Sequence, residues 1–163
     1  MPDQNAPEPG RFAVSALTPQ ATHILSLSLE DAMPSLAGAR YQFKTSAESL
    51  FSPEQPETIR IDVQVEATAR PAGARKIAAK PKVRLRVAVL FSYKGLEDLR
   101  KNGALPLELG WTAVSIAYST VRGIFQARLA GTSFGNALLP IVSPQQLWQP
   151  TTTPDTELGE PPE

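Results

Sequence analysis

Few residues of this chain have the type and spacing that catalysis or metal binding requires. His23, the single histidine, alternates with the residues of an apolar run, so we expect an imidazole at the edge of a strand rather than a general base or a metal ligand. Asp62 and Glu66 stand four residues apart on one face of a predicted strand. That spacing separates them by about 13 Å, too far for two carboxylates to share a proton or a substrate bond. We therefore interpret both as solvated charges.

The short motifs that hold nucleophiles, nucleotides or metals are missing from the sequence. It contains no G-x-S-x-G for a nucleophile elbow, and neither G-x-x-x-x-G-K-S/T nor G-x-G-x-x-G for phosphates. The chain has no cysteine, which removes disulfides, thiolate nucleophiles and cysteine-ligated metals. The sequence thus predicts a protein that is not an enzyme and uses no cofactor or metal.

Two segments with alternating apolar residues must position whatever surface the protein uses. In Lys82 to Gly95 the odd positions are apolar from Val83 to Tyr93, and in Ile59 to Arg70 apolar and polar residues alternate throughout. Each pattern is typical of an antiparallel strand with one buried face. The eleven residues between them are too few for a crossover helix, so we predict that the two strands pair as a long hairpin.

Two weaker strands are predicted before this hairpin. The segment His23 to Glu30 places Leu25, Leu27 and Leu29 on one face, and Ala39 to Lys44 alternates through Tyr41 and Phe43 as an edge or bent strand. The two prolines of Ser52 to Glu57 predict a loop before the hairpin begins.

Beyond Gly95 the apolar spacing changes to three and four residues, which is typical of helices. Leu96 to Asn102 predicts one or two turns closed by Gly103, and an amphipathic helix is predicted from about Glu108 to Leu129. Gly123 inside that helix suggests a close backbone contact, while Gly131 is expected to end it. An apolar loop and a short helix begun by Ser143 and Pro144 follow. The prediction is an α+β fold, with a four-stranded antiparallel sheet packed against one long helix and a short C-terminal helix.

Composition bounds the domain organisation and the compartment. The 163 residues carry 16 Lys and Arg against 16 Asp and Glu, so overall charge indicates no nucleic-acid partner. Proline and acidic residues predict a disordered lead at 1–10 and a disordered acidic tail at 150–163, on either side of one domain at 11–149. With neither a signal sequence nor a long apolar run, the chain is expected to be cytoplasmic and not inserted in a membrane.

The order of predicted elements, together with several short segments, resembles the SecB family of export chaperones. Ile116 to Arg122 occupies the frame of an Ile-x-Phe-Pro-Tyr-x-Arg type helix segment, although Ser119 and Thr120 replace Pro-Tyr. Leu139 to Val142 matches a Leu-Pro-x-x element, Leu147 and Trp148 match the apolar end of the last helix, and Phe91 to Gly95 matches a strand end. The similarity runs from about Phe12 to Trp148, but the last helix is shorter than in the family.

This resemblance implies a chaperone that binds unfolded polypeptide in an apolar groove without ATP and assembles as a dimer of dimers, a homotetramer. In the family, the export motor SecA docks on an acidic sheet surface, whereas the polar face here is mainly basic. This difference argues against SecA as a partner. A SecB-like chaperone for another client, such as an antitoxin, fits this surface at least as well. Arg60, Asp62, Arg84 and Arg86 form that polar face. The candidate groove residues are Leu25, Leu27, Tyr41, Phe43, Phe134, Leu138, Leu139, Ile141 and Trp148.

Two other classes of function remain open from the sequence. A nucleic-acid binder could use the basic sheet face together with Arg75, Lys76 and Lys80 of the hairpin connector, and its affinity would fall steeply with salt. The connector is equally explained as a solvated loop. A structural subunit would use the sheet and helix only to build an oligomer, and the same apolar residues would then form a core or a subunit interface.

Overall fold

A computed structural model describes residues 16–30, 38–70, 80–100 and 105–148. The predicted lead at 1–10, Arg75 and Lys76 of the connector, Gly103 and the predicted acidic tail at 150–163 lie outside these residues.

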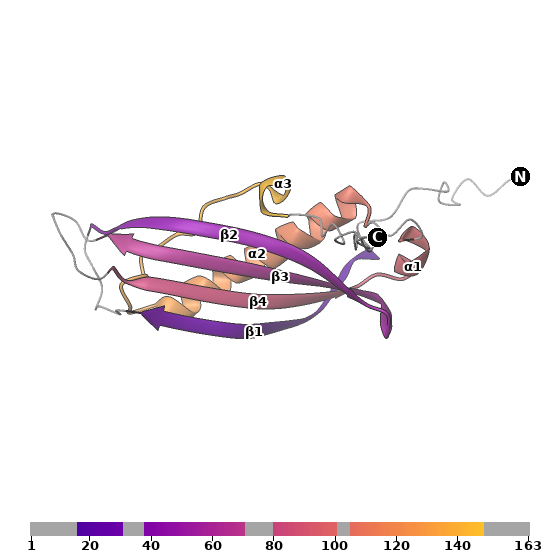
Figure 1. The fold of residues 1–163 in the computed structure, drawn as a ribbon, viewed down its shortest axis with the longest axis horizontal. Helices are drawn as coiled ribbons and strands as arrows, with labels where there is room; N and C mark the ends of the chain where they lie inside the picture. The colour runs from indigo at the N-terminus through magenta and orange to yellow at the C-terminus, as the bar shows by residue number, and fades with distance from the viewer. Residues whose placement is uncertain (1–15, 31–37, 71–79, 101–104, 149–163) are drawn as a thin grey trace, which may run out of the picture.

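Four antiparallel strands form one sheet in the order β1-β4-β3-β2 (Figure 1). The strands are β1 (Thr18–Glu30), β2 (Arg40–Ser52), β3 (Gln55–Arg70) and β4 (Lys82–Ser92). Because β3 and β4 lie in the middle, β1 and β2 are the two edge strands. Together with the helices on one face, this sheet confirms the predicted α+β fold.

The central hairpin pairs as the alternation predicted. β3 and β4 are in continuous register from Thr58 opposite Ser92 to Thr68 opposite Lys82. The loop predicted over Ser52 to Glu57 is wrong, because only Pro53 and Glu54 separate β2 from β3 and Ser52 already pairs with Gln55. Pro56 is tolerated near the start of β3, where a strand can lack a backbone donor.

Three helices follow the sheet along the chain: α1 (Leu96–Leu99), α2 (Leu107–Leu129) and α3 (Pro144–Leu147). The 23 residues of α2 extend about 34 Å at 1.5 Å per residue, and the helix crosses one face of the sheet (Figure 1). It ends two residues before Gly131, whose φ of 80° belongs to the left-handed region, as expected for a residue that stops a helix.

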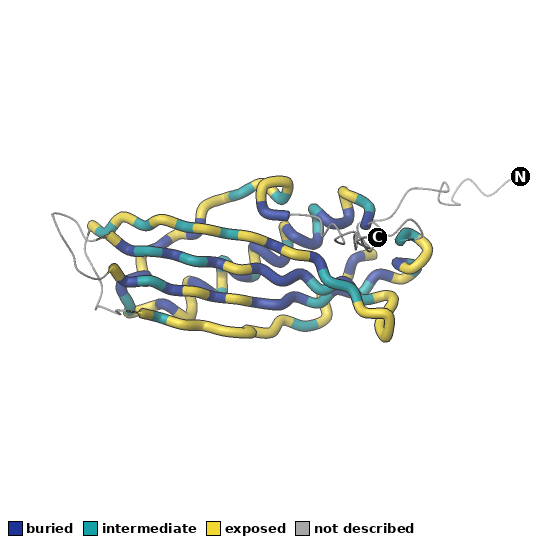
Figure 2. The backbone as a smooth tube through the Cα atoms, in the orientation of Figure 1, coloured by how far each residue is buried: buried dark blue, intermediate teal, exposed yellow. Residues whose placement is uncertain are grey.

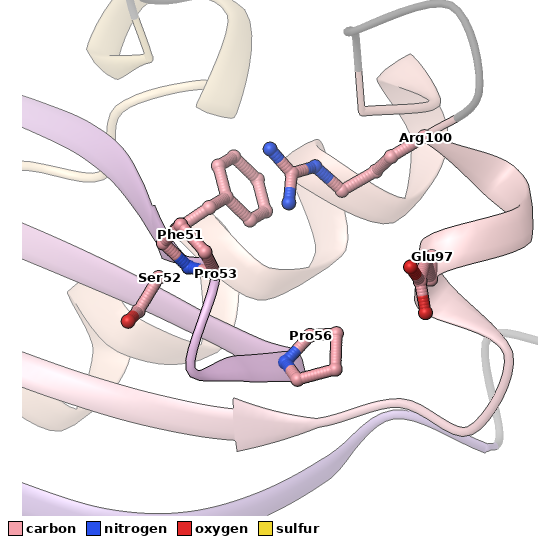
Figure 3. Close-up of a pocket in the computed structure, with 6 residues that line it drawn as sticks. All are labelled: Phe51, Ser52, Pro53, Pro56, Glu97 and Arg100. Carbon is pink, nitrogen blue, oxygen red and sulfur yellow. The ribbon is translucent and has the colours of Figure 1, made fainter.

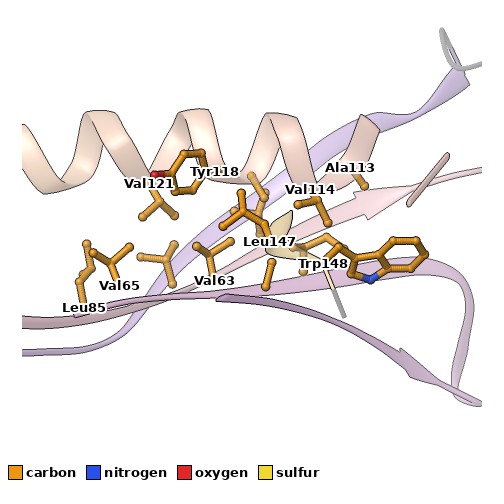
Figure 4. Packing of buried hydrophobic residues seen from close by; sticks show 14 of the residues in the cluster. Val63, Val65, Leu85, Ala113, Val114, Tyr118, Val121, Leu147 and Trp148 are labelled. Atoms are coloured by element: carbon orange, nitrogen blue, oxygen red, sulfur yellow. The ribbon is translucent and has the colours of Figure 1, made fainter. Parts of the chain in front are cut away.

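The core lies between α2 and the central strands. Figure 4 shows Val63, Val65 and Leu85 of the sheet facing Val114 and Val121 of the helix. These residues are fully or almost fully buried, which is where most of the hydrophobic stabilisation of the fold arises. The inward rows of β3 and β4 are buried, whereas β1 is exposed along most of its length (Figure 2).

The alternation predicted for the first strand is interrupted. The register of β1 against β4 shifts between Ile24 and Ser26, which leaves Leu25 without a paired partner. Ile24 is opposite Val87 and Leu27 is opposite Leu85, so those two side chains share the helix side of the sheet. A β-bulge of this kind adds one residue to a strand and therefore changes which residues share a face.

The close backbone contact predicted at Gly123 is wrong, and such a contact occurs instead at Gly110, near the start of α2. A Cβ added at Gly123 would have no other heavy atom within 4 Å, whereas one added at Gly110 would lie 2.6 Å from Cη2 of Trp148. Trp148 thus packs its ring directly on the backbone of α2, and only glycine leaves room for it.

Candidate functional site

The nine predicted groove residues do not form one continuous surface. Leu25 and Leu27 lie on edge strand β1, while Tyr41 and Phe43 lie on the opposite edge strand β2. Three strand spacings separate the two edges, about 14 Å across the sheet. The structure therefore divides the predicted groove into a β1 side and a side formed by β2 with the loop between α2 and α3.

Three of the predicted groove residues belong to the core of the monomer. Phe134 is fully buried, and Leu139 and Trp148 are almost so. Trp148 also forms an isolated parallel bridge with Ala47 of β2 and donates a hydrogen bond from Nε1 to Oγ of Ser49 at 3.2 Å. In this conformation these three side chains are not available to a client, because the monomer's own packing uses them.

Tyr41 and Phe43 are half-buried and belong to an aromatic cluster at the start of β2. The ring centroid of Tyr41 lies 5.9 Å from that of Phe134, and that of Phe43 lies 6.4 Å from that of Phe125. The Tyr41 hydroxyl donates a hydrogen bond of 2.7 Å to the carbonyl of Ser133, and burial raises the pKa of Tyr41. The cluster holds the beginning of the α2–α3 loop against β2.

The α2–α3 loop presents two large apolar side chains to solvent. Leu138 is 66% exposed and Ile141 is 88% exposed, and we call these two residues the loop patch. Between them Leu139 points into the core, and the Tyr118 hydroxyl donates a hydrogen bond of 2.8 Å to the carbonyl of Pro140. The loop is therefore anchored at the very residues that separate the two exposed side chains.

A second apolar surface lies on β1 and includes one residue that the sequence analysis missed. Ile24, Leu25 and Leu27 are each about two-fifths exposed, at 38%, 42% and 40%, and we call them the β1 patch. Ile24 was missed because strict alternation assigned it to the polar face. The signal available was the pair of adjacent apolar residues Ile24 and Leu25, which a regular strand with one solvated face does not favour.

The polar face of the sheet is less basic than its composition suggests. Nε of Arg60 lies 2.6 Å from Asp62, and Nη2 of Arg86 lies 3.0 Å from the same carboxylate. The Asp62 side chain is almost buried beneath them, so its interpretation as a solvated charge is wrong. The hydrogen bond with Asp62 is the main cause that raises the pKa of Arg60. On the predicted face Arg60, Asp62 and Arg86 are thus one compact ion-pair cluster.

A second cluster lies further along the same face. Nζ of Lys82 lies 2.9 Å from Oε1 of Glu66, and Nε of Arg84 lies 3.2 Å from Oε2. These partners, Lys82 first, lower the pKa of Glu66. Asp62 and Glu66 are each shared by two cations, so a polyanion would meet partly neutralised charge rather than a free row of arginines.

A cavity of about 390 Å³ at the β2–β3 turn was not predicted at all (Figure 3). Its wall includes Arg100 of the segment after α1, whose guanidinium carbon lies 3.6 Å from the centroid of the Phe51 ring. No sequence pattern connects these two residues, because the contact depends on how α1 folds back over the turn. In the described residues no three His, Cys, Asp or Glu side chains are grouped as metal ligands, and no described helix is long and apolar enough to cross a membrane.

No protein-family model matches the sequence, and no curated protein sequence is significantly similar to it. One similar solved structure is the Mycobacterium tuberculosis Rv1957 SecB-like chaperone in complex with a ChAD peptide from the Rv1956 HigA1 antitoxin. The two chains are 12% identical with a TM-score of 0.49, over 80% of this chain and 93% of the other. The function therefore has to be argued from the side chains described above.

Proposed function

We propose that this protein is a SecB-like chaperone that holds unfolded or non-native polypeptide on exposed apolar side chains, without ATP and without catalysis. The observation that carries the proposal is the loop patch, in which Leu138 and Ile141 are exposed on a loop anchored by Tyr118. Large apolar side chains that a fold presents on an anchored segment, rather than burying, are typical of an interaction site.

The energetics suit weak and repeated binding of extended chain. A fully buried apolar side chain contributes about 1.5 to 3 kcal/mol, so two of them give only modest affinity and several together give useful affinity. Because Tyr118 and the buried Leu139 already fix the loop, little conformational entropy is lost when a client binds there. Such a site needs no cofactor, and a client can leave it spontaneously.

The polar face of the sheet indicates which class of client is favoured. The shared carboxylates of the sheet face do not form the acidic surface that SecA docking would need, so we propose a dedicated client, such as an antitoxin, in preference to SecA-dependent export. We also propose a cytoplasmic homo-oligomer, with a dimer of dimers as the expected form.

An assembly subunit remains the second candidate, because the β1 patch favours it. An edge strand of 13 residues with three half-exposed apolar side chains is suited to cover by a second chain. A nucleic-acid binder is disfavoured by the two ion-pair clusters, since four cations of the described polar face share two carboxylates.

Suppression of aggregation tests the proposal. A chemically unfolded client is diluted into buffer with the protein, and light scattering is followed at about 0.05 M and about 0.5 M salt, where screening lengths differ severalfold. We expect protection at both salt concentrations and its loss in the double variant Leu138→Ser, Ile141→Ser. The control is Leu107→Ser, since Leu107 is 56% exposed at the start of α2, outside the loop.

Two results would contradict the proposal, the first its binding site and the second the chaperone function itself. One is equal loss of protection in the control and the double variant, which would show that the loop patch has no particular role. The other is a wild-type protein that gives no protection and instead binds an oligonucleotide with an affinity that falls steeply with salt.

A further inference from the structure

We propose that the cavity at the β2–β3 turn is a subsite for one acidic residue of an extended polypeptide, next to a proline or aromatic residue. This cavity, the Arg100 pocket, is lined by Phe51, Ser52, Pro53, Pro56, Glu97 and Arg100. The inference rests on the proposed binding of polypeptide clients and names the kind of sequence within a client that this site would select.

Arg100 has unused hydrogen-bonding capacity. Its Nε is buried without a hydrogen-bond partner, and no ion pair with a carboxylate of the described residues involves it. The N–H groups of its two Nη atoms lie in one plane and match a carboxylate in two parallel bonds. Arg100 is therefore a cation at the wall of a cavity whose natural counter-ion the described chain does not supply.

The aromatic ring of Phe51 holds the Arg100 cation in place. The guanidinium lies over the Phe51 ring, with its carbon 3.6 Å from the centroid, and this contact restricts the plane in which its N–H groups can donate to a ligand (Figure 3). A preorganised donor of this kind loses little rotamer entropy when an acceptor binds. The restricted plane favours a carboxylate that enters edge-on.

The charges of the pocket disfavour polyanions and favour a peptide. Glu97 lines the same cavity, so a phosphate with two negative charges would be repelled at one wall while it is attracted at the other. A peptide has both an acidic side chain for Arg100 and backbone N–H groups that can donate to Glu97. The rings of Pro53 and Pro56 add flat apolar walls, against which a proline or an aromatic ring of the peptide can pack.

The position of the pocket suits a chain that already contacts β2. Phe51 lies four residues along β2 from Ala47, where Trp148 forms its bridge, and this distance is about 13 Å in a strand. An extended client of a few residues covers such a distance. The same chemistry is present in the chain's own residues 150–163, which include Asp155, Glu157, Glu160 and Glu163, and the experiment below separates the two sources.

The test is direct binding of a designed peptide to the full chain. The probe is fluorescein-labelled Gly-Phe-Pro-Asp-Pro-Phe-Gly amide, its partner has Asn in place of Asp, and fluorescence anisotropy gives both affinities. We expect the Asp peptide to bind about tenfold more tightly, as for a charged hydrogen bond that is partly shielded from water. Arg100→Met keeps a side chain that can pack on Phe51, and it should remove this preference while leaving the Asn peptide unchanged.

The control variant is Arg128→Met, at an exposed position in the last turn of α2, and it should keep the preference. Equal affinity for the two peptides in the wild type, or the same preference in Arg100→Met, would overturn the proposal. Truncation after Pro150 should leave the affinity unchanged. A gain in affinity on truncation would instead assign the pocket to the chain's own acidic residues and overturn its assignment to a client.

Failure of this inference is distinguishable from failure of the proposed function. Wild-type protein that suppresses aggregation yet shows no Asp preference would remove the subsite and leave the chaperone function standing. Wild-type protein that shows the Arg100-dependent preference without suppressing aggregation would support the pocket and contradict the chaperone function.

Discussion

The two edges of the sheet are treated in opposite ways. At β2 the chain returns after α2, places Phe134 against Tyr41, bridges Trp148 to Ala47 and so closes much of the strand within the monomer. Among the described residues, β1 pairs only with β4, and its other edge is open. The apolar side chains of the β1 patch stay about two-fifths exposed.

This difference distinguishes an edge strand that the monomer covers from an edge strand that remains open. An open edge with apolar side chains invites pairing with other chains, and proteins usually cover or charge such an edge. Because the described residues supply a cover for β2 and not for β1, we expect β2 mutations to act on folding and β1 mutations to act on association.

The largest effect is expected for Trp148→Ala. The change removes a buried indole that packs on Gly110 and donates to Ser49, so the free energy of unfolding should fall by about 3 to 5 kcal/mol. Urea unfolding followed by circular dichroism measures this loss. A change below about 1 kcal/mol would show that the β2 edge does not depend on its cover.

Gly110→Ala tests the same closure from the helix side. The added Cβ would lie 2.6 Å from the indole ring, which must shift or strain at a cost of about 1 to 3 kcal/mol. Gly123→Ala is the matched control, because nothing lies within 4 Å of its added Cβ and alanine is the better helix former. Unfolding experiments should therefore show opposite signs for the two variants, and equal signs would contradict the contact.

Tyr118→Phe removes the hydrogen bond to the carbonyl of Pro140 and should cost about 1 kcal/mol near neutral pH. Burial raises the pKa of Tyr118 above that of tyrosine in the unfolded chain, partly opposed by Arg122. In the native state the Tyr118 hydroxyl therefore stays protonated to a higher pH than in the unfolded chain. The stability that its hydrogen bond contributes is complete below about pH 10 and is lost as pH rises through the higher native pKa. Unfolding at pH 8 and above pH 10 should show the gap between variant and wild type narrowing.

Leu27→Lys should have the smallest effect on stability, because Leu27 lies on the open edge and already meets solvent. We expect a change of about 0.5 kcal/mol in unfolding free energy, together with loss of any self-association measured by analytical ultracentrifugation. Lys44→Leu on the exposed face of β2 is a control for a change of charge on an edge strand, and it should leave association intact. An unchanged oligomer in Leu27→Lys would contradict the role assigned to the β1 patch.

The parts of the fold that repeat regularly could be predicted from the sequence. The alternation from Ile59 to Arg70 and from Val83 to Tyr93 reflects one buried face in each strand. Burial of that face produces a period of two in the apolar residues, which the sequence alone shows. The long helix was equally clear, since its inward row recurs at three and four residues.

The contacts that decide the site could not be predicted. Trp148 meets Gly110, and Arg100 meets Phe51, because of how distant segments are folded back, and neither residue type indicates its partner. The bulge at Leu25 changes which residues of β1 lie on the helix side of the sheet, so Ile24 lies there together with Leu27. One extra residue is enough for this change, because it inverts a period of two. Short-range pattern thus predicted the elements but assigned to the groove three side chains that the monomer buries.

The bulges of β1 limit how far any added strand can grow. Its register shifts between Pro19 and Ala21 and again between Ile24 and Ser26, so regular pairing is confined to short segments such as Ser26 to Glu30. A bulged strand is bent and more strongly twisted than a regular one. It therefore cannot template the long, flat, stacked sheets of amyloid. The edge can therefore stay exposed and apolar while it accepts only short strands, which gives the protein an open surface with little risk of seeding fibres.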